Sequence, residues 1–313
     1  MTPGSEKLYL NKRVLLTGGS GFIGRRLKRR LSGLGASVRS LDNRTAADAM
    51  PGDLRCDITD VKAVRAAVAE ARPGIVFHLA GRTDRGDRPE LVRPLLEVNL
   101  LGTVNLFESL LSAGGCAAVV VSGAAEEYGR SAPPFLESFR EDPVTPYSLS
   151  KVCVSKLAKM FHNVYGFPAI ILRPTLAYGP GQEPGMFIPA LINALLKGEK
   201  FPMTPGEQTR DFVYVDDLVD AYLAAGISGR GFGEVFNIGS GAPCKIKDLA
   251  RMAAALLGKE RLLEMGAKSY RAAEIMDYRV DISRAKESFG WSPATSLEKG
   301  LKLTIEGSAD ARS

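Results

Sequence analysis

Glycines at positions 18, 21 and 24 connect a short apolar run to a helical pattern, and no other feature constrains the fold as strongly. Residues 14–17 are predicted to form a buried strand, and residues 22–34 have the spacing of a helix. Glycine allows the tight turn between them and lets a bound anion approach the backbone. A pyrophosphate would lie there on the N–H groups and positive dipole of the helix N-terminus. The turn therefore predicts a dinucleotide site at Gly18, Gly21, Phe22, Ile23 and Gly24.

Short apolar runs alternate with helical patterns through the first half of the chain, where the longest predicted helices span residues 91–113 and 147–165. Strands separated by helices form a parallel sheet that is covered on both faces. After Pro174 the alternation becomes irregular, and Gly and Pro are frequent. We therefore predict an α/β fold. A Rossmann-type doubly wound parallel sheet over residues 1–174 would bind the dinucleotide, and residues 175–313 would form a smaller mixed α/β lobe interleaved with it.

An acidic residue, Asp42, ends the second predicted strand, 18 residues beyond Gly24. An acid at this place accepts hydrogen bonds from the ribose hydroxyls and repels a 2′-phosphate, so NAD is favoured over NADP. Arg39 and Arg44 lie close enough in sequence to reach a phosphate, which leaves NADP possible. Asp57 is placed to hold the adenine, or alternatively to cap the helix that follows. The predicted ribose and adenine contacts are Asp42, Asn43, Arg44, Asp57 and Ile58.

Tyr147 and Lys151 stand four residues apart, on one face of a predicted helix that has Pro146 in its first turn. A free tyrosine has a pKa of about 10 and is a poor acid or base at neutral pH. A lysine one turn away, with a positive nicotinamide beside it, stabilises the phenolate and lowers that pKa. The spacing predicts that Tyr147 exchanges a proton with an oxygen of the substrate and that Lys151 supports it and holds the ribose.

The composition argues against several classes of protein. The net charge is +6, but the one dense basic cluster, at residues 25–30, is interpreted as a solvated helix face, so no nucleic-acid partner is expected. No apolar run approaches the roughly 20 residues that span a bilayer, and residues 1–13 lack the apolar core of a signal peptide. Four scattered cysteines and two histidines give no metal-type spacing. We expect a cytoplasmic protein with no metal and no membrane partner.

Together these motifs resemble the extended short-chain dehydrogenase/reductase family of nucleotide-sugar epimerases, dehydratases and 4-ketoreductases. The resemblance covers residues 12–303 and includes the glycine turn, the Tyr147 and Lys151 pair, His78-Leu79-Ala80-Gly81, Leu172-Arg173-Pro174 and Arg210-Asp211-Phe212. It implies NAD(P)-dependent redox chemistry on a nucleotide-diphosphate sugar.

The resemblance also implies roles for residues outside the two motifs. The implied cofactor contacts are Leu79, Ala80, Gly81, Thr83, Asn99 and Pro174. The implied substrate contacts are Thr83, Tyr178, Phe187, Ile188, Arg210 and Arg271, with the two arginines on the diphosphate. Asn99 has an alternative interpretation as a structural residue that binds backbone, and the two arginines as surface ion-pair partners.

One position departs from the family pattern. Members of the family carry Ser or Thr four residues before the loop tyrosine, which is Tyr128 here, and that hydroxyl helps to hold the substrate's reacting oxygen. This chain has Ala124 instead. Ser122 is the nearest hydroxyl in the sequence and is a catalytic candidate if the loop is rearranged; Thr83, Glu126 or a water are the other candidates.

The residues around Glu126 decide between reactions. The run Glu126-Glu127-Tyr128-Gly129 resembles the GDP-4-keto-6-deoxymannose reductase branch, so the leading expectation is reduction of the 4-keto group of an NDP-4-keto-6-deoxyhexose. The implied preference for NAD favours the alternative, an NDP-sugar 4-epimerase with tightly bound NAD. A 4,6-dehydratase is less expected, because the Asp-Glu pair of the dTDP type is replaced by Ala125-Glu126. Ala124 leaves a non-catalytic NAD-binding protein as a further alternative.

The predicted helices at 91–113 and 147–165 are apolar on more than one face. Helices of this kind pair across a dimer in similar family members, so a homodimer is expected.

Overall fold

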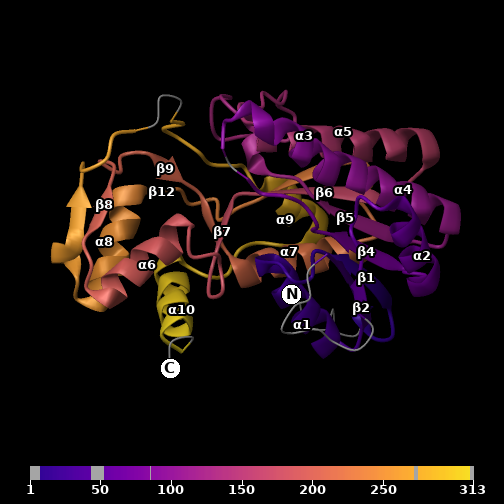
Figure 1. The fold of residues 1–313 in the computed structure, drawn as a ribbon, viewed down its shortest axis with the longest axis horizontal. Helices are drawn as coiled ribbons and strands as arrows, with labels where there is room; N and C mark the ends of the chain where they lie inside the picture. Colours follow the sequence, from indigo (N-terminus) through magenta and orange to yellow (C-terminus); the bar gives the residue numbers. More distant parts are fainter. Residues whose placement is uncertain (1–7, 44–52, 85, 271–273, 311–313) are drawn as a thin grey trace.

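A parallel sheet of seven strands forms the centre of the molecule, with the strand order β11-β6-β5-β4-β1-β2-β3. The structure is a computed structural model that describes residues 8–43, 53–84, 86–270 and 274–310. The predicted α/β fold is confirmed (Figure 1). In chain order the strands are β1 (Arg13–Thr17), β2 (Ser37–Asp42), β3 (Leu54–Arg55), β4 (Ile75–His78), β5 (Ala118–Ser122), β6 (Ala169–Pro174) and β11 (Val235–Ile238).

The central strands are continuous apolar runs because both of their faces are buried. The parallel register brings their carboxyl ends to one edge of the sheet, where Thr17 pairs with His78 and Ser122 pairs with Leu172. The turns that follow β1, β4, β5 and β6 therefore meet at this edge. A ligand of a doubly wound sheet binds outside the carboxyl ends of the strands.

Helices cover the two faces of the sheet in separate apolar clusters. One cluster packs α1, α7 and α9 against residues such as Leu16 and Val120, and the other packs α2, α4 and α5 against residues such as Leu15 and Val121. The six helices are α1 (Phe22–Gly33), α2 (Val61–Ala71), α4 (Gly102–Ala113), α5 (Pro146–Tyr165), α7 (Val215–Ile227) and α9 (Ser283–Phe289).

The helix expected over residues 91–113 is not uniform. It comprises the 3₁₀ turn η2 (Pro89–Leu91), the α-helical turn α3 (Val92–Leu95), the π-helical turn η3 (Leu96–Leu101) and then α4. A π turn carries hydrogen bonds from residue i to i+5, which apolar spacing alone does not reveal. Another 3₁₀ turn, η4 (Ala125–Tyr128), follows β5.

The part of the chain that follows Pro174 contributes both to the sheet and to a smaller lobe, which lies at the left of Figure 1. Strand β11 extends the sheet by pairing with β6, and α7 packs on α1. A third apolar cluster forms the core of the smaller lobe. Its elements are β7 (Leu176–Tyr178), α6 (Phe187–Lys197), β8 (Phe201–Met203), β9 (Thr209–Arg210), β10 (Phe212–Tyr214), β12 (Cys244–Lys245), α8 (Ile246–Leu257), η5 (Glu260–Leu262), β13 (Leu263–Met265) and α10 (Leu297–Asp310).

Over the described ranges, no helix combines the length and the apolar character that a membrane span requires.

Candidate active site

The glycine turn forms a cradle that side chains would fill. A Cβ on Gly18 would lie 2.7 Å from the backbone nitrogen of Ala80, and a Cβ on Gly24 would lie 2.1 Å from the carbonyl oxygen of Gly18. Helix α1 begins at Phe22 with Gly21 as its N-cap, so no side chain caps the helix and its first turn carries no acidic residue. The N–H groups and the positive helix dipole at this end suit a pyrophosphate. The residues present therefore fit the expected dinucleotide.

Asp42 is held at the end of β2 by the same turn. Its carboxylate accepts hydrogen bonds from the Ser20 N–H at 2.8 Å and from the Ser20 hydroxyl at 2.5 Å. The Arg39 guanidinium forms an ion pair with Glu70 on α2, so it is engaged away from Asp42. Arg44, the other candidate for a 2′-phosphate, lies outside the described residues, and Asn43 is exposed beside Asp42. The described residues present an acid at the position predicted for the ribose, which favours NAD.

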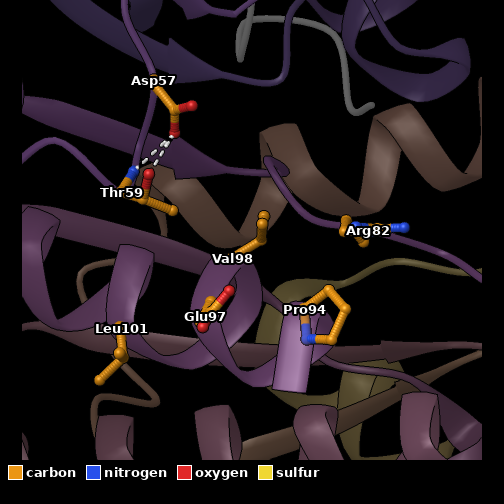
Figure 2. Close-up of a pocket in the computed structure, with 7 residues that line it drawn as sticks. All are labelled: Asp57, Thr59, Arg82, Pro94, Glu97, Val98 and Leu101. Atoms are coloured by element: carbon orange, nitrogen blue, oxygen red, sulfur yellow. Dashed lines mark hydrogen bonds between the residues drawn. The ribbon is translucent and has the colours of Figure 1, made fainter. Parts of the chain in front are cut away.

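A pocket lies at Asp57, the residue predicted to hold the adenine (Figure 2). Asp57 accepts hydrogen bonds from the N–H and the hydroxyl of Thr59, and these bonds lower the pKa of Asp57. Helix α2 is capped by Asp60, so the alternative interpretation of Asp57 as the helix cap is wrong. Ile58 is buried against Gly102 at the start of α4. The pocket is lined by Asp57, Thr59, Arg82, Pro94, Glu97, Val98 and Leu101.

Tyr147 and Lys151 face the carboxyl edge of the sheet from the first turns of α5. Thr145 caps this helix by accepting a hydrogen bond from the Ser148 N–H at 3.1 Å. The Lys151 Nζ lies 5.9 Å from the centre of the Tyr147 ring and donates a hydrogen bond to the Ser122 carbonyl at 2.8 Å. Both side chains are buried, with Lys151 only 6% exposed. The lysine is thus fixed beside the tyrosine, as the spacing predicts.

Burial lowers the pKa of Lys151 to about 8, although the negative charges of Glu127 and Glu126 oppose the shift. An ammonium with this pKa is largely charged at neutral pH and loses its charge as the pH rises through about 8. The charge of Lys151 favours the phenolate of Tyr147. Lys151 therefore supports Tyr147 only below this pH.

Ala124 is buried in an apolar cluster with Tyr147, Leu91 and Leu95. The position of the family's hydroxyl therefore presents a methyl group next to the tyrosine. Ser122 does not replace that hydroxyl in the structure. The Ser122 hydroxyl accepts a hydrogen bond from Tyr222 on α7, on the face of the sheet opposite to α5, and it is the Ser122 carbonyl that contacts Lys151.

The other two candidates differ in their surroundings. Glu126 is half-buried in η4 and its charge reaches Lys151. Thr83 is exposed in the turn after β4. Of these two residues, Glu126 is thus the better placed to affect Lys151 beside Tyr147.

Glu127 and Arg173 stand in two of the quoted motifs, but the buried ion pair between them was not predicted. The Glu127 carboxylate accepts hydrogen bonds from the Ala124 N–H at 2.8 Å and from the Arg173 Nε at 2.9 Å. Arg173 also donates to Glu141 at 2.8 Å, and its guanidinium stacks over the Tyr128 ring. A charged arginine inside the apolar run of β6 was the available signal, because a buried charge requires a partner.

The cofactor contacts implied by resemblance lie along the carboxyl edge. Leu79 and Ala80 follow β4, and a Cβ on Gly81 would come within 2.9 Å of the Asn99 side chain. Asn99 accepts a hydrogen bond from the Arg82 N–H and donates to the Arg82 carbonyl and the Ser150 hydroxyl. Its structural interpretation therefore has direct support. Pro174 ends β6 at the same edge.

The residues implied to contact the substrate differ in their burial and in their partners. Tyr178 and Ile188 are buried in the core of the smaller lobe, whereas Phe187 is only partly buried at the start of α6. Arg210 donates hydrogen bonds to the carbonyls of Thr209 and Ile275 and pairs with Glu274, one of the alternatives left open for it. Arg271 lies outside the described residues. The contacts of this group with a substrate stay predictions.

Known proteins are similar to this chain in sequence and in fold. The model of the NAD dependent epimerase/dehydratase family matches residues 14–239. The chain is 31% identical to the UDP-glucose 4-epimerase of Mycolicibacterium smegmatis over 309 residues, which covers 94% of this chain and 97% of the relative. It is 27% identical to the GDP-6-deoxy-D-mannose reductase of Pseudomonas aeruginosa, with 95% and 97% covered. The solved structure of MoeE5 in complex with UDP-glucuronic acid and NAD has a TM-score of 0.85 at 31% identity, with 95% and 99% covered.

The chain therefore belongs to the NAD dependent epimerase/dehydratase family. The resemblance to extended short-chain dehydrogenases/reductases is confirmed, and so are an enzyme of this type and NAD as its cofactor. Which residues contact the cofactor and the substrate stays a prediction.

We predict that replacing Glu126 lowers the pKa of Lys151. Glu126→Gln removes a negative charge that favours the ammonium, and we expect a decrease of roughly half a unit, the effect of one charge in a partly solvated site. A heteronuclear NMR titration of labelled lysine side chains measures this pKa. Glu298→Gln, on the surface of α10, is the control and should leave Lys151 unchanged. A Lys151 pKa near 10 in the parent protein would contradict the account.

We predict that Asp42 determines the choice of NAD. Asp42→Ala should weaken NAD binding by roughly tenfold or more, since hydrogen bonds to a charged group contribute about 1.5–3 kcal/mol, and should improve binding of NADP relative to NAD. Isothermal titration with each dinucleotide measures both effects. Arg39→Gln is the matched control, because Arg39 is paired with Glu70; a change of preference in this variant, with none in Asp42→Ala, would refute the assignment.

Proposed function

We propose that the chain is a nucleotide-sugar 4-epimerase that oxidises and re-reduces C4 of an NDP-sugar with resident NAD. The observation that carries the proposal is the carboxylate of Asp42, which Ser20 holds at the position predicted for the ribose while Arg39 is engaged by Glu70. This arrangement suits NAD, the cofactor that an epimerase keeps bound. Relatives named as UDP-glucose 4-epimerase and UDP-glucuronate 4-epimerase, at 31% and 30% identity, support the same reaction.

In the proposed reaction Tyr147 takes the proton from the C4 hydroxyl and later returns it to the C4 oxygen. Lys151, held by the Ser122 carbonyl, keeps the phenolate stable and binds the cofactor ribose. Bound NAD supplies the acceptor and donor of the C4 hydrogen. Because Ala124 presents a methyl group beside Tyr147, the tyrosine holds the reacting oxygen without the second hydroxyl of the family pattern.

The second candidate is reduction of a 4-keto group in an NDP-4-keto-6-deoxyhexose. Glu126 favours this reaction, because it belongs to the run that resembles the reductase branch and its negative charge acts on Lys151. The relative named GDP-6-deoxy-D-mannose reductase supports it as well. Glu127, the second acid of that run, gives weaker support, because it is buried and binds Arg173 and the Ala124 N–H. We therefore place the epimerase first.

The smaller lobe is proposed to bind the nucleotide diphosphate. Phe187 at the start of α6 and Arg210 on β9 are the described candidates for the nucleotide and the diphosphate. Arg210 would have to exchange its contact with Glu274 for a phosphate. Residues 1–174 would hold the cofactor and the catalytic pair, and residues 175–313 would supply this lobe.

We predict that the protein as purified interconverts UDP-glucose or UDP-glucuronate with its C4 epimer, measured by chromatography of the sugar nucleotides. Tyr147→Phe should reduce turnover by a factor of about 10² or more, the usual contribution of a general acid–base group. Tyr165→Phe, exposed at the end of the same helix, is the control and should retain turnover. Stoichiometric oxidation of NADH or NADPH by GDP-4-keto-6-deoxymannose, without epimerisation, would establish the reductase instead.

We also propose a homodimer through α4 and α5, where Leu111, Leu149, Met160 and Val164 are exposed. Apolar side chains gathered on neighbouring helices are typical of an interface. Light scattering during size-exclusion chromatography should give a mass of two chains of 33.6 kDa. Met160→Glu combined with Val164→Asp should yield monomers. The exposed Met276 lies outside these helices, so Met276→Glu is the control and should leave the dimer intact. A monomeric parent protein would refute the proposal.

A further inference from the structure

Buried hydrogen bonds connect the end of β1 to the catalytic helix, and His78 lies at their centre. We propose that neutral His78 is a positioning residue that fixes the cofactor-binding turns relative to α5. The proposal rests on the catalytic roles proposed for Tyr147 and Lys151. The family resemblance includes the run His78-Leu79-Ala80-Gly81 but gives the imidazole no role, so the assignment comes from its hydrogen bonds to Thr17 and Thr103.

The bonds on the cofactor side have a defined direction. The Ala80 N–H donates to the Thr17 hydroxyl at 3.1 Å, so the single proton of that hydroxyl is available for His78 Nδ1, which lies 2.7 Å away. Ala80 is the residue against which Gly18 packs. The imidazole therefore supports the turn after β1 and the turn after β4 through one threonine.

The bonds on the other side determine the tautomer of His78. The Thr103 hydroxyl donates to the Asn99 carbonyl, because a carbonyl can only accept. Thr103 must then accept from His78 Nε2, at 2.8 Å, so Nε2 carries the proton and Nδ1 is the acceptor. Burial, with the nearby charge of Lys151, lowers the pKa of His78 to about 3, which agrees with a neutral ring.

Asn99 continues the chain into the active site. Its side-chain nitrogen donates to the Ser150 hydroxyl at 2.8 Å, and Ser150 donates to the Tyr147 carbonyl at 2.7 Å. Asn99 lies in the π-helical turn η3, and π turns occur frequently at functional sites. The chain thus begins at a turn of the cofactor site and ends at the backbone of the catalytic tyrosine.

The two threonine hydroxyls of the chain can be removed with little change in the shape of the side chain. Thr103→Val keeps the volume and loses the hydroxyl, whereas Thr103→Ser keeps the hydroxyl and loses a methyl group. We expect Thr103→Val to speed amide hydrogen exchange of residues 146–152 at least tenfold in the NAD-bound protein, and Thr103→Ser to stay within threefold of the parent. Thr304→Val is the matched control, since Thr304 is also buried and also donates to the carbonyl four residues earlier, in α10.

The role of His78 itself is tested from the far side of the imidazole. Thr17→Val should also speed exchange of residues 146–152, although Thr17 lies on β1. The double variant with Thr103→Val should show less than the product of the two single effects, because either change interrupts the same chain. The proposal would be overturned if the two single effects on the exchange rate multiplied in the double variant, or if Thr17→Val left the exchange of residues 146–152 unchanged. If the valine variants do not fold, loss of protection at residues 146–152 in Thr103→Ser or Thr17→Ser would overturn it equally.

The kinetic readout separates positioning from stability. With UDP-glucose as substrate, Thr103→Val should lower kcat at least tenfold and change KM less than threefold, whereas Thr304→Val should change neither. An equal loss in both variants would show a structural role only and would overturn the proposal. Hydrogen exchange needs no substrate, so a chain inactive on UDP-sugars would refute the proposed function and still leave the role of His78 to be decided.

Discussion

The hydrogen bond from Lys151 to the Ser122 carbonyl ties the catalytic helix to the middle of the sheet. An ammonium group buried to this extent is costly unless it is hydrogen-bonded, and the end of β5 supplies the acceptor. Strand β5 is in turn held between β4 and β6 by parallel pairing. Because Lys151 is fixed in this way, the tyrosine one turn earlier on α5 is placed where the turns of the cofactor site meet.

A second constraint acts on the loop between β5 and α5. The buried pair of Glu127 and Arg173 binds the Ala124 N–H and reaches Glu141, so the backbone of this loop is held by charge-assisted hydrogen bonds. Removing one partner of such a pair costs about 3–5 kcal/mol, since it leaves an uncompensated buried charge. These contacts hold the loop in place with an alanine at position 124.

Sequence reasoning predicted the local structure correctly. The glycine turn, Asp42 and the Tyr147–Lys151 spacing each lie within one strand, turn or helix, so their places in the fold could be inferred from neighbours in the chain. Sequence reasoning was wrong, or left alternatives open, where contacts join distant segments. The direction of the Ser122 hydroxyl depends on Tyr222, a hundred positions away, and the ion pair left open for Arg210 is formed with the distant Glu274. The π turn, the burial of Tyr178 and the pairing of β11 with β6 likewise depend on tertiary packing.

The central claim is that a hydrogen leaves C4 of a sugar nucleotide and returns to the same carbon while Tyr147 handles the proton of the oxygen. The most direct measurement uses UDP-glucose and UDP-glucuronate labelled with deuterium at C4 and incubated with the NAD-bound protein in ordinary water. We expect a C4 epimer that retains the deuterium at C4. An epimer that carries solvent hydrogen at C4, or the absence of an epimer from both compounds, would contradict it.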